Sequence, residues 1–297
     1  PEIDMASASL KMNEDGSFNL LVGATDLGTG SDTVLAQIAA ETLTVPAEKV
    51  IVYSSDTDLT PFDVGAYASS TTYLSGMAVK KAAEKVRDQI TGVASSVTGV
   101  NREKIFLDSG EAKAGNQSIS LSRIASYSLY ESDQFQIMAT ASHVSHKSPP
   151  PFSAHFVEVI VDTATGKIRV KKYVAAVDCG TAINPKMAEG QTEGAVLNGI
   201  SYALTEQYLF DKKGKMLNPN LNYYKIFSSR DLPEIKTILV PTHEPTGPYG
   251  AKSVSEISIN GPIPAISNAV YDAVGIRLRR APFTPDRVLE ALEKLKS

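Results

Sequence analysis

The loop Gly28-Thr29-Gly30-Ser31 is the first stretch of the chain whose residue types could serve chemistry. Glycines let backbone N–H groups approach a ligand closely, and a helix that starts directly after the loop attracts negative charge. The glycine spacing fits neither the Walker loop nor the dinucleotide-binding fingerprint. Taken alone, the segment is interpreted first as a strand-to-helix turn capped by Ser31 or Asp32, and second as a cradle for a phosphate or a polar ring edge.

The segment Ala68-Ser69-Ser70-Thr71 is the second candidate, because small and hydroxyl-bearing residues directly precede a predicted helix. Hydroxyl groups and free N–H groups at such a position suit an anion or a heterocycle. The alternative is a helix start that carries several capping hydroxyls, and this alternative is favoured when the segment is considered alone.

A third candidate region runs from Cys179 into a predicted helix that contains several glycines. A lone buried cysteine is more often a small apolar residue than a nucleophile. Gly190, Gly194 and Gly199 each cost about 1 kcal/mol relative to alanine inside a helix. A closely approaching backbone or ligand would offset this cost, and the side-chain amide of Gln191 could bind such a ligand.

Glu256 is the fourth candidate, because small and apolar residues surround it in the sequence. Such surroundings would raise the pKa of its carboxyl group and suit a general base. The alternative is a surface glutamate that the helix dipole favours near a helix start. His143 and His146 have no third ligand nearby, so they are interpreted as ordinary polar residues and not as metal ligands.

The hydrophobic pattern predicts the elements that must position these residues. Alternating apolar residues predict hairpins at about 10–22 and 157–174. Helical spacing predicts helices at about 34–39, 74–88, 121–127, 185–208, 266–274 and 285–295. Pro149-Pro150-Pro151 marks a boundary, so two subdomains are expected, at 1–148 and 149–297, with the candidate Glu256 in the second. This mixture predicts an α+β fold of two mixed α/β subdomains, in which β-hairpins pack against helices.

Composition excludes several classes of function. The chain has 297 residues, 42% of them hydrophobic, which suits a soluble globular protein with a core of its own. The net charge of −4 argues against nucleic-acid binding, and no apolar run approaches the roughly 20 residues that would span a membrane. The single cysteine excludes an internal disulfide and a thiolate zinc site. A cytoplasmic, reducing location is expected, and no signal peptide is visible.

Four longer stretches, in this order, resemble the molybdenum-binding region of the xanthine dehydrogenase and aldehyde oxidase family, the molybdenum hydroxylases. The stretches are GATDLGTGSDTVLAQIAAETL, DVGAYASSTTYLSGMAV, FVEVIVDTATGKIRVKKYVAAVDCGTAINPKMAEGQTEGA and GPYGAKSVSEISINGPIPAISNAVYDAV. The similarity runs from about Ile3 to Leu292 and is closest to bacterial members. Ordered matches of this length are far more specific than any one of the four motifs.

The resemblance implies an oxidoreductase that hydroxylates a carbon of an N-heterocycle or an aldehyde with water as the oxygen source. The implied cofactor is molybdenum-molybdopterin in its cytosine dinucleotide form, and the pterin dithiolene holds the metal in place of protein ligands. Glu256 matches the base of the Lys-x-x-x-Glu pattern that starts at Lys252, and Gln191 matches a glutamine near the cofactor. Further matches to residues that line the pterin and its phosphates are Ala68, Ser69 and Thr71, and matches to the first cofactor loop are Gly28, Gly30 and Ser31. Thr29 and Ser70 lie within these two loops and are expected to contact the cofactor as well.

The resemblance also implies partners. Another half of the molybdenum region precedes this one in the family, in the same chain or in a separate subunit, and it contacts the small-molecule substrate. Iron–sulfur clusters require several cysteines, so these clusters and FAD are expected on other domains or subunits. The chain starts at Pro1 without an initiator methionine, so we expect a processed subunit or a piece of a longer protein that is inactive alone.

Two residues depart from the family pattern. Thr29 stands where many members have glutamine, and it removes one amide contact. Ser255 stands where many have glycine, and its Cβ restricts the backbone. These departures support an alternative hypothesis, a non-catalytic cofactor-binding or scaffold subunit. Composition alone would also allow an α+β interaction module, which the ordered motif matches disfavour.

Overall fold

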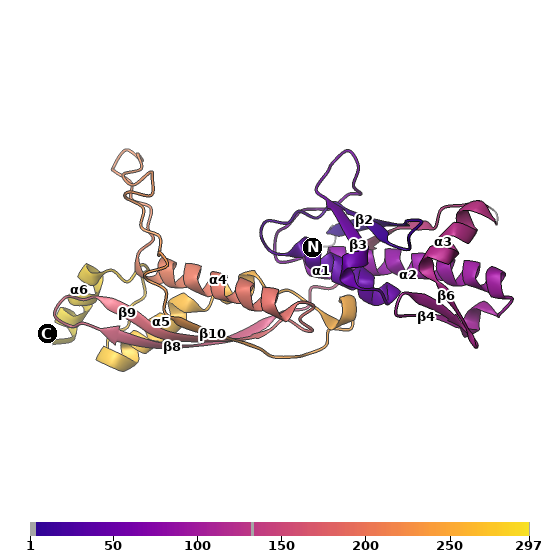
Figure 1. The fold of residues 1–297 in the computed structure, drawn as a ribbon. Helices are drawn as coiled ribbons and strands as arrows, with labels where there is room; N and C mark the ends of the chain where they lie inside the picture. Colours follow the sequence, from indigo (N-terminus) through magenta and orange to yellow (C-terminus); the bar gives the residue numbers. More distant parts are fainter. Residues whose placement is uncertain (1–3, 132–133, 297) are drawn as a thin grey trace. The chain divides into compact units, whose positions relative to one another are not determined.

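The computed structural model describes residues 4–131 and 134–296. They form two compact units, and Figure 1 labels most of their helices and strands. Unit 1 contains the chain up to Pro150 together with His243–Ser253, and unit 2 contains Pro151–Thr242 together with the chain from Val254 onward. The expected division at 148 and 149 placed all of 149–297 in one subdomain. The structure differs from it because the short segment His243–Ser253 packs with the first unit.

Unit 1 is built on a four-stranded sheet in the order β3-β2-β1-β7. Its strands are β1 (Met5–Met12), β2 (Phe18–Val22), β3 (Val50–Ser54) and β7 (Met138–Val144). The predicted first hairpin is confirmed, since β1 and β2 pair antiparallel around a turn in which Gly16 has a φ of 79°. Two helices pack here, α1 (Ser31–Leu43) and α2 (Thr71–Thr98), and α2 contacts both β1 and β7.

A second, smaller sheet completes unit 1. Strands β4 (Ile105–Asp108), β5 (Glu111–Ala114) and β6 (Gln117–Ser120) pair antiparallel in sequence order. For this part of the chain, the hydrophobic pattern predicts one helix and none of the three strands. That helix is confirmed as α3 (Leu121–Tyr130), and the Ser120 hydroxyl caps it by accepting a hydrogen bond from the N–H of Arg123.

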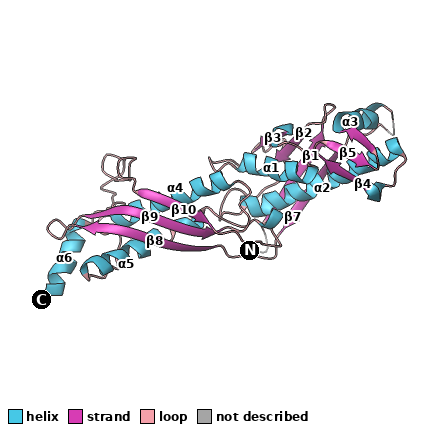
Figure 2. Ribbon diagram, turned by 60° about the horizontal axis from the view of Figure 1, so that its bottom comes forward, coloured by secondary structure: helices cyan, strands magenta, loops and turns pink. Residues whose placement is uncertain are grey.

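Unit 2 is built on a three-stranded sheet in the order β10-β9-β8. The predicted second hairpin is confirmed as β8 (Phe152–Val161) and β9 (Ile168–Asp178), and β10 (Glu234–Leu239) pairs parallel with β9. Helices α4 (Pro185–Leu204), α5 (Pro262–Val274) and α6 (Pro285–Lys296) share one core with this sheet. Figure 2 shows helices and strands in both units, as the α+β prediction requires.

Helix α4 begins as the sequence predicts and ends earlier. Asn184 accepts a hydrogen bond from the N–H of Met187 at 3.1 Å, and Pro185 occupies the first turn, where its missing N–H costs nothing. The helix ends at Leu204 and not near residue 208. Figure 1 shows that part of the connection between α4 and β10 projects away from the helices as a long loop.

Short 3-10 helices complete the described chain: η1 (Ala47–Lys49), η2 (Arg102–Lys104), η3 (Pro248–Gly250) and η4 (Glu256–Ile259). None of the described helices combines the length and the apolar composition that crossing a membrane would require.

Candidate functional site

The glycine-rich loop of unit 1 is organised around its own carboxylate. Asp26 accepts hydrogen bonds from the backbone N–H groups of Gly28 at 2.9 Å, Gly30 at 3.1 Å and Asp32 at 3.3 Å. Partial burial opposes ionisation of Asp26, but these hydrogen bonds outweigh it and lower the pKa of the carboxyl group. The N–H groups predicted to cradle an anionic ligand thus already hold a negative charge from the loop.

Helix α1 consequently starts without the side-chain cap that the sequence suggested. Its N-cap is Gly30, in the left-handed region at φ 78°, and no side-chain capping bond is made by that residue. The expectation that Ser31 or Asp32 would cap the helix is wrong, because Asp26 reaches the first turn from upstream in the loop.

Two polar atoms beside this loop are buried without a partner in the described chain. The Ser31 side chain is 6% exposed, and its hydroxyl makes no hydrogen bond to a described residue. Asp32 accepts a hydrogen bond from the Ser54 hydroxyl through Oδ2, whereas its Oδ1 is buried and unpaired among the described residues. An unmet buried polar group costs about 1–3 kcal/mol, so this is a place where a polar ligand would be stabilising.

The second loop holds two consecutive residues in an uncommon conformation. Ala68 and Ser69 have φ of 49° and 55°, in the left-handed region that non-glycine residues seldom adopt. Ser70 is the N-cap of α2, but its side chain makes no capping bond and donates to the carbonyl of Tyr67 at 2.8 Å. The alternative interpretation, a hydroxyl-capped helix start, is therefore not supported by the geometry of Ser70.

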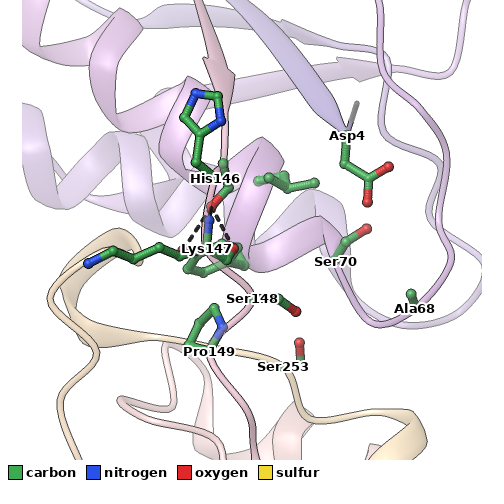
Figure 3. A pocket seen from close by; sticks show the side chains of 11 residues that line it. Asp4, Ala68, Ser70, His146, Lys147, Ser148, Pro149 and Ser253 are labelled. Atoms are coloured by element: carbon green, nitrogen blue, oxygen red, sulfur yellow. Dashed lines mark hydrogen bonds between the residues drawn. The ribbon is translucent and has the colours of Figure 1, made fainter. Parts of the chain in front are cut away.

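A cavity of about 200 Å³ opens beside this loop. It is lined by Asp4, Ala68, Ser70, Tyr73, Leu74, Ser145, His146, Lys147, Ser148, Pro149 and Ser253. Figure 3 shows the hydroxyl groups of Ser70, Ser148 and Ser253 on the same side as Asp4, while the Lys147 side chain extends away from them. Hydroxyl groups on the same side as one carboxylate suit a polar heterocycle with N–H donors better than an apolar ligand.

Residues 145–148 line this cavity but were not predicted as site residues, because the three prolines that follow them were interpreted only as a domain boundary. Hydroxyl-bearing and basic residues between a strand and that proline run were the available signal. The same analysis selected Ala68 and Ser70, which do line the cavity, whereas Gly28–Ser31 are not among its lining residues.

A network of hydrogen bonds fixes the walls of the cavity. The Tyr67 hydroxyl donates to Asp4 at 2.5 Å, and this bond raises the pKa of Tyr67. The Tyr73 hydroxyl lies 2.7 Å from the Thr246 hydroxyl and 3.1 Å from that of Ser145. Hydrogen bonds between residues that are far apart in the sequence therefore stabilise the wall of the cavity.

Lys252 has a structural partner within unit 1. Its side chain is 9% exposed, and its amine donates a hydrogen bond to the carbonyl of Pro150 at 3.0 Å. Gly247, in the same returning segment, lies so close to the carbonyl of Ala251 that a Cβ would stand 1.8 Å from its oxygen. The hydrogen bonds from Lys252 to Pro150 and between Tyr73 and Thr246 join His243–Ser253 to the rest of unit 1. The assignment of Lys252 to the cofactor stays a prediction.

In unit 2, the residue before Glu256 contacts Gln191. The Ser255 hydroxyl donates a hydrogen bond to Gln191 Oε1 at 3.2 Å, and η4 packs against α4. Glu256 itself, the first residue of η4, is exposed. Among the described residues, the small and apolar sequence neighbours of Glu256 do not bury it, so the expected apolar surroundings are not found there.

The three glycines of α4 have different environments. A Cβ on Gly199 would stand 2.5 Å from Cγ of Pro262 and 2.9 Å from the carbonyl of Ile259, so close packing requires glycine there. Gly190 and Gly194 are exposed and face open space. The closely approaching backbone that was expected to offset the cost of helical glycines is therefore present at Gly199. No described residue approaches Gly190 or Gly194 in the same way.

Each unit thus gathers part of the predicted set. Ala68 and Ser70 meet Ser253 around the cavity of unit 1, and Gln191 meets Ser255, next to Glu256, in unit 2. Within residues 4–131 and 134–296, no group of three or more histidine, cysteine, aspartate or glutamate side chains is arranged to hold a metal ion. Cys179 is buried in the core of unit 2, as predicted.

Comparison with known proteins gives consistent matches. Residues 2–233 match the family model of the molybdopterin cofactor-binding domain. The probable hypoxanthine oxidase XdhD of Escherichia coli K12 is 40% identical over 99% of this chain and 31% of its own length. The xanthine dehydrogenase molybdenum-binding subunit of Escherichia coli O157:H7 is 36% identical over 97% of this chain and 39% of its own.

The fold has a close counterpart among solved structures. The crystal structure of quinoline 2-oxidoreductase from Pseudomonas putida 86 matches with a TM-score of 0.92 and 25% identity, over 99% of this chain and 39% of that one. The predicted α+β class is confirmed. The chain spans between about a third and two fifths of the length of these relatives.

Proposed function

This chain belongs to the molybdopterin cofactor-binding domain family, in the molybdenum-binding region of the bacterial xanthine dehydrogenase and aldehyde oxidase family, and on that premise we propose that it forms the C-terminal half of the catalytic region of a molybdenum hydroxylase. The observation that carries the proposal is the meeting of Gln191 with the residue before Glu256, because it joins two separately predicted site segments. The whole enzyme would act on an N-heterocycle or an aldehyde.

The residues present fit a large polar cofactor. Ser31 has a buried hydroxyl without a described partner, and Gly190 and Gly194 leave open space along an exposed helix face. The cavity beside Ala68 and Ser70 offers hydroxyl groups for a polar heterocycle. We propose that these groups hold a molybdenum-molybdopterin in its cytosine dinucleotide form.

The remaining predicted contacts are Gly28, Thr29, Gly30, Ser69, Thr71 and Lys252, which we propose border the same cofactor. The backbone N–H groups of Gly28 and Gly30 already donate hydrogen bonds to Asp26. These two glycines would therefore let the cofactor come close to the backbone without donating hydrogen bonds to it.

When bound, a molybdenum-pterin group supplies the acceptor for the two electrons that leave the substrate carbon. The chain's own residues would manage the proton. The Glu256 carboxylate accepts it from the water-derived oxygen that attacks the electron-poor carbon, which is general-base catalysis. Gln191 Oε1 accepts the Ser255 hydrogen bond, so the Gln191 amide presents its NH₂ group as a donor to the cofactor side.

The missing parts of such an enzyme follow from coverage and composition. This chain covers only 31% and 39% of the lengths of the two matched relatives, and we propose that the remainder contacts the substrate. Iron–sulfur clusters and FAD would lie on other domains or subunits, because one cysteine cannot ligate a cluster. The cytoplasmic location stays a prediction.

A second candidate function is a cofactor-binding or scaffold subunit without catalysis. The observations that favour it are the occupied N–H groups of the glycine loop and the exposed carboxylate of Glu256.

The deciding experiment is the molybdenum-to-protein ratio of the complex that is purified from its native host through a tag on this chain. About one molybdenum per copy, with the absorbance of iron–sulfur or flavin partners, is the expected result. A well-formed complex without molybdenum, from cells grown with ample molybdate, would contradict the catalytic function and support the scaffold subunit.

A further inference from the structure

The sheet of unit 2 has an uncovered face with an unusual composition. Along β8 the side chains alternate, and Val157, Val159 and Val161 point inward to the core that α4, α5 and α6 share. Phe156 lies on the opposite side and is 64% exposed. On β10, Ile238 is likewise on the outer side and is 42% exposed.

Strand register gathers these residues into one patch. Phe156 pairs with Val174, Ala154 pairs with Ala176, and Ala176 pairs with Ile238 on its other side. Directly paired residues project to the same face of a sheet, so the five side chains are neighbours across all three strands. We name this patch, Ala154, Phe156, Val174, Ala176 and Ile238, the outer apolar face.

The adjoining part of the same face provides an internal comparison. There Lys171 pairs with Glu158 at 3.0 Å and Lys172 with Glu234 at 2.9 Å, and all four side chains are exposed. Charged pairs are what the solvated side of a one-sided sheet normally carries. The outer apolar face departs from this pattern: its one charged neighbour among the directly paired residues is Lys236, which pairs with Val174 and is exposed. A contiguous exposed apolar patch usually marks an interaction site.

We propose that the outer apolar face is the docking surface for the part of the molybdenum-binding polypeptide that lies outside these 297 residues. The occupant follows from coverage, because the two curated relatives extend well beyond the aligned 31% and 39% of their lengths, and that remainder must pack somewhere. Helices α4, α5 and α6 form the second layer on the inner face of the sheet, so an apolar outer face is the side on which a further layer can pack. The inference rests on the proposed function in that it takes the occupant from the molybdenum-binding relatives.

The test uses the molybdenum-binding polypeptide in its purified complex, with single substitutions Phe156→Cys, Ile238→Cys and, as the matched control on the charged stretch, Lys171→Cys. Each is treated with a water-soluble maleimide, and modification is quantified by peptide mass spectrometry, which separates the new cysteine from others. Covered sites react only through local opening, so Cys at 156 and 238 should react about tenfold or more slowly than Cys at 171.

A photo-reactive benzoylphenylalanine at position 156 then identifies the occupant. Cross-links to peptides of the same polypeptide outside the 297 residues are expected. Equal labelling at 156 and 171, or cross-links to residues 4–150, to another subunit or to a second copy, would overturn the proposal. Molybdenum is measured in the same samples. If positions 156 and 238 are protected but molybdenum is absent, the docking surface is supported and the proposed function is contradicted. If both positions are labelled as fast as position 171 while molybdenum is fully present, the docking surface is contradicted and the proposed function is supported.

Discussion

The hydroxyl of Ser255 donates a hydrogen bond of 3.2 Å to Oε1 of Gln191. The two residues are 64 positions apart in the sequence, and the bond joins α4 to the segment that carries Glu256. Ser255 has φ −63° and ψ −62°, a right-handed conformation that any L-residue adopts. The serine that replaces the family's glycine is therefore not strained, and it adds a contact that glycine could not make.

Loss of the Ser255 hydroxyl should change the orientation of Gln191. In the complete enzyme, Ser255→Ala should lower kcat/KM, while Ser255→Thr, which keeps the hydroxyl, should restore most of it. The free energy of unfolding should fall by about 0.5–1.5 kcal/mol, the usual net value of one hydrogen bond. Steady-state kinetics and urea unfolding measure the two effects. Identical kinetics for the alanine and threonine variants would show that the hydroxyl does not position Gln191.

Removal of the Glu256 carboxylate should abolish most turnover. Glu256→Gln keeps the size of the side chain but cannot accept the proton, so kcat should fall roughly a hundredfold or more while molybdenum content stays unchanged. Glu293→Gln, at an exposed residue of α6, is the matched control and should leave the rate unchanged. Near-normal turnover of the Glu256 variant would end its assignment as the base.

Asp26 should make the stability of the chain depend on pH. Its pKa is lowered in the fold, so its stabilisation is complete above the ordinary aspartate value of about 3.9 and is lost as pH falls through the folded pKa. Asp26→Ala should therefore lower the free energy of unfolding at pH 7 and flatten its decline below pH 4. Urea unfolding at pH 7 and below pH 4 measures both effects, with the exposed Asp272→Asn as the control. If the free energy of unfolding of Asp26→Ala declined in acid as steeply as that of the unchanged chain, this role of Asp26 would be contradicted.

Gly194 should behave differently in the isolated chain and in the complex. Because its Cβ position is open, Gly194→Ala should stabilise the isolated chain by up to about 1 kcal/mol through helix propensity. The same methyl group should reduce molybdenum content if a cofactor or the rest of the polypeptide approaches that face. Gly92→Ala is the control, because Gly92 lies in α2 with an equally open Cβ position. It should stabilise the chain without changing the molybdenum content. Full molybdenum content in both variants would refute an approach at Gly194.

The cavity of unit 1 should be sensitive to added volume. Ser148→Leu places a branched side chain at the wall of a space of about 200 Å³, so cofactor content should fall severalfold while the fold is retained. Lys147→Leu is the comparison, because Figure 3 shows that side chain extending away from the hydroxyl cluster. Circular dichroism checks the fold and metal analysis the content. Equal loss in both variants would argue against a ligand inside the cavity.

Local sequence patterns predicted the elements well where the physical signal is itself local. The hairpins at about 10–22 and 157–174 and the start of the helix at residue 185 all depend on residues a few positions apart. Short strands such as β5 and β10 were missed, because their weak alternation becomes a strand only through pairing with a distant neighbour. Ordered motifs also sufficed to predict the family.

The tertiary structure decided what depends on contacts between distant segments. Lys252 and Glu256 are four positions apart, yet the first is buried in unit 1 beside Pro150 and the second is exposed in unit 2. The sequence did not reveal whether the backbone N–H groups of the glycine loop are free for a ligand or already bound to Asp26, because the same residues allow several loop conformations. The sequence by itself determined residue chemistry, local conformation and family. Only the fold decided burial and partners, because both are properties of the residues that surround a side chain in space.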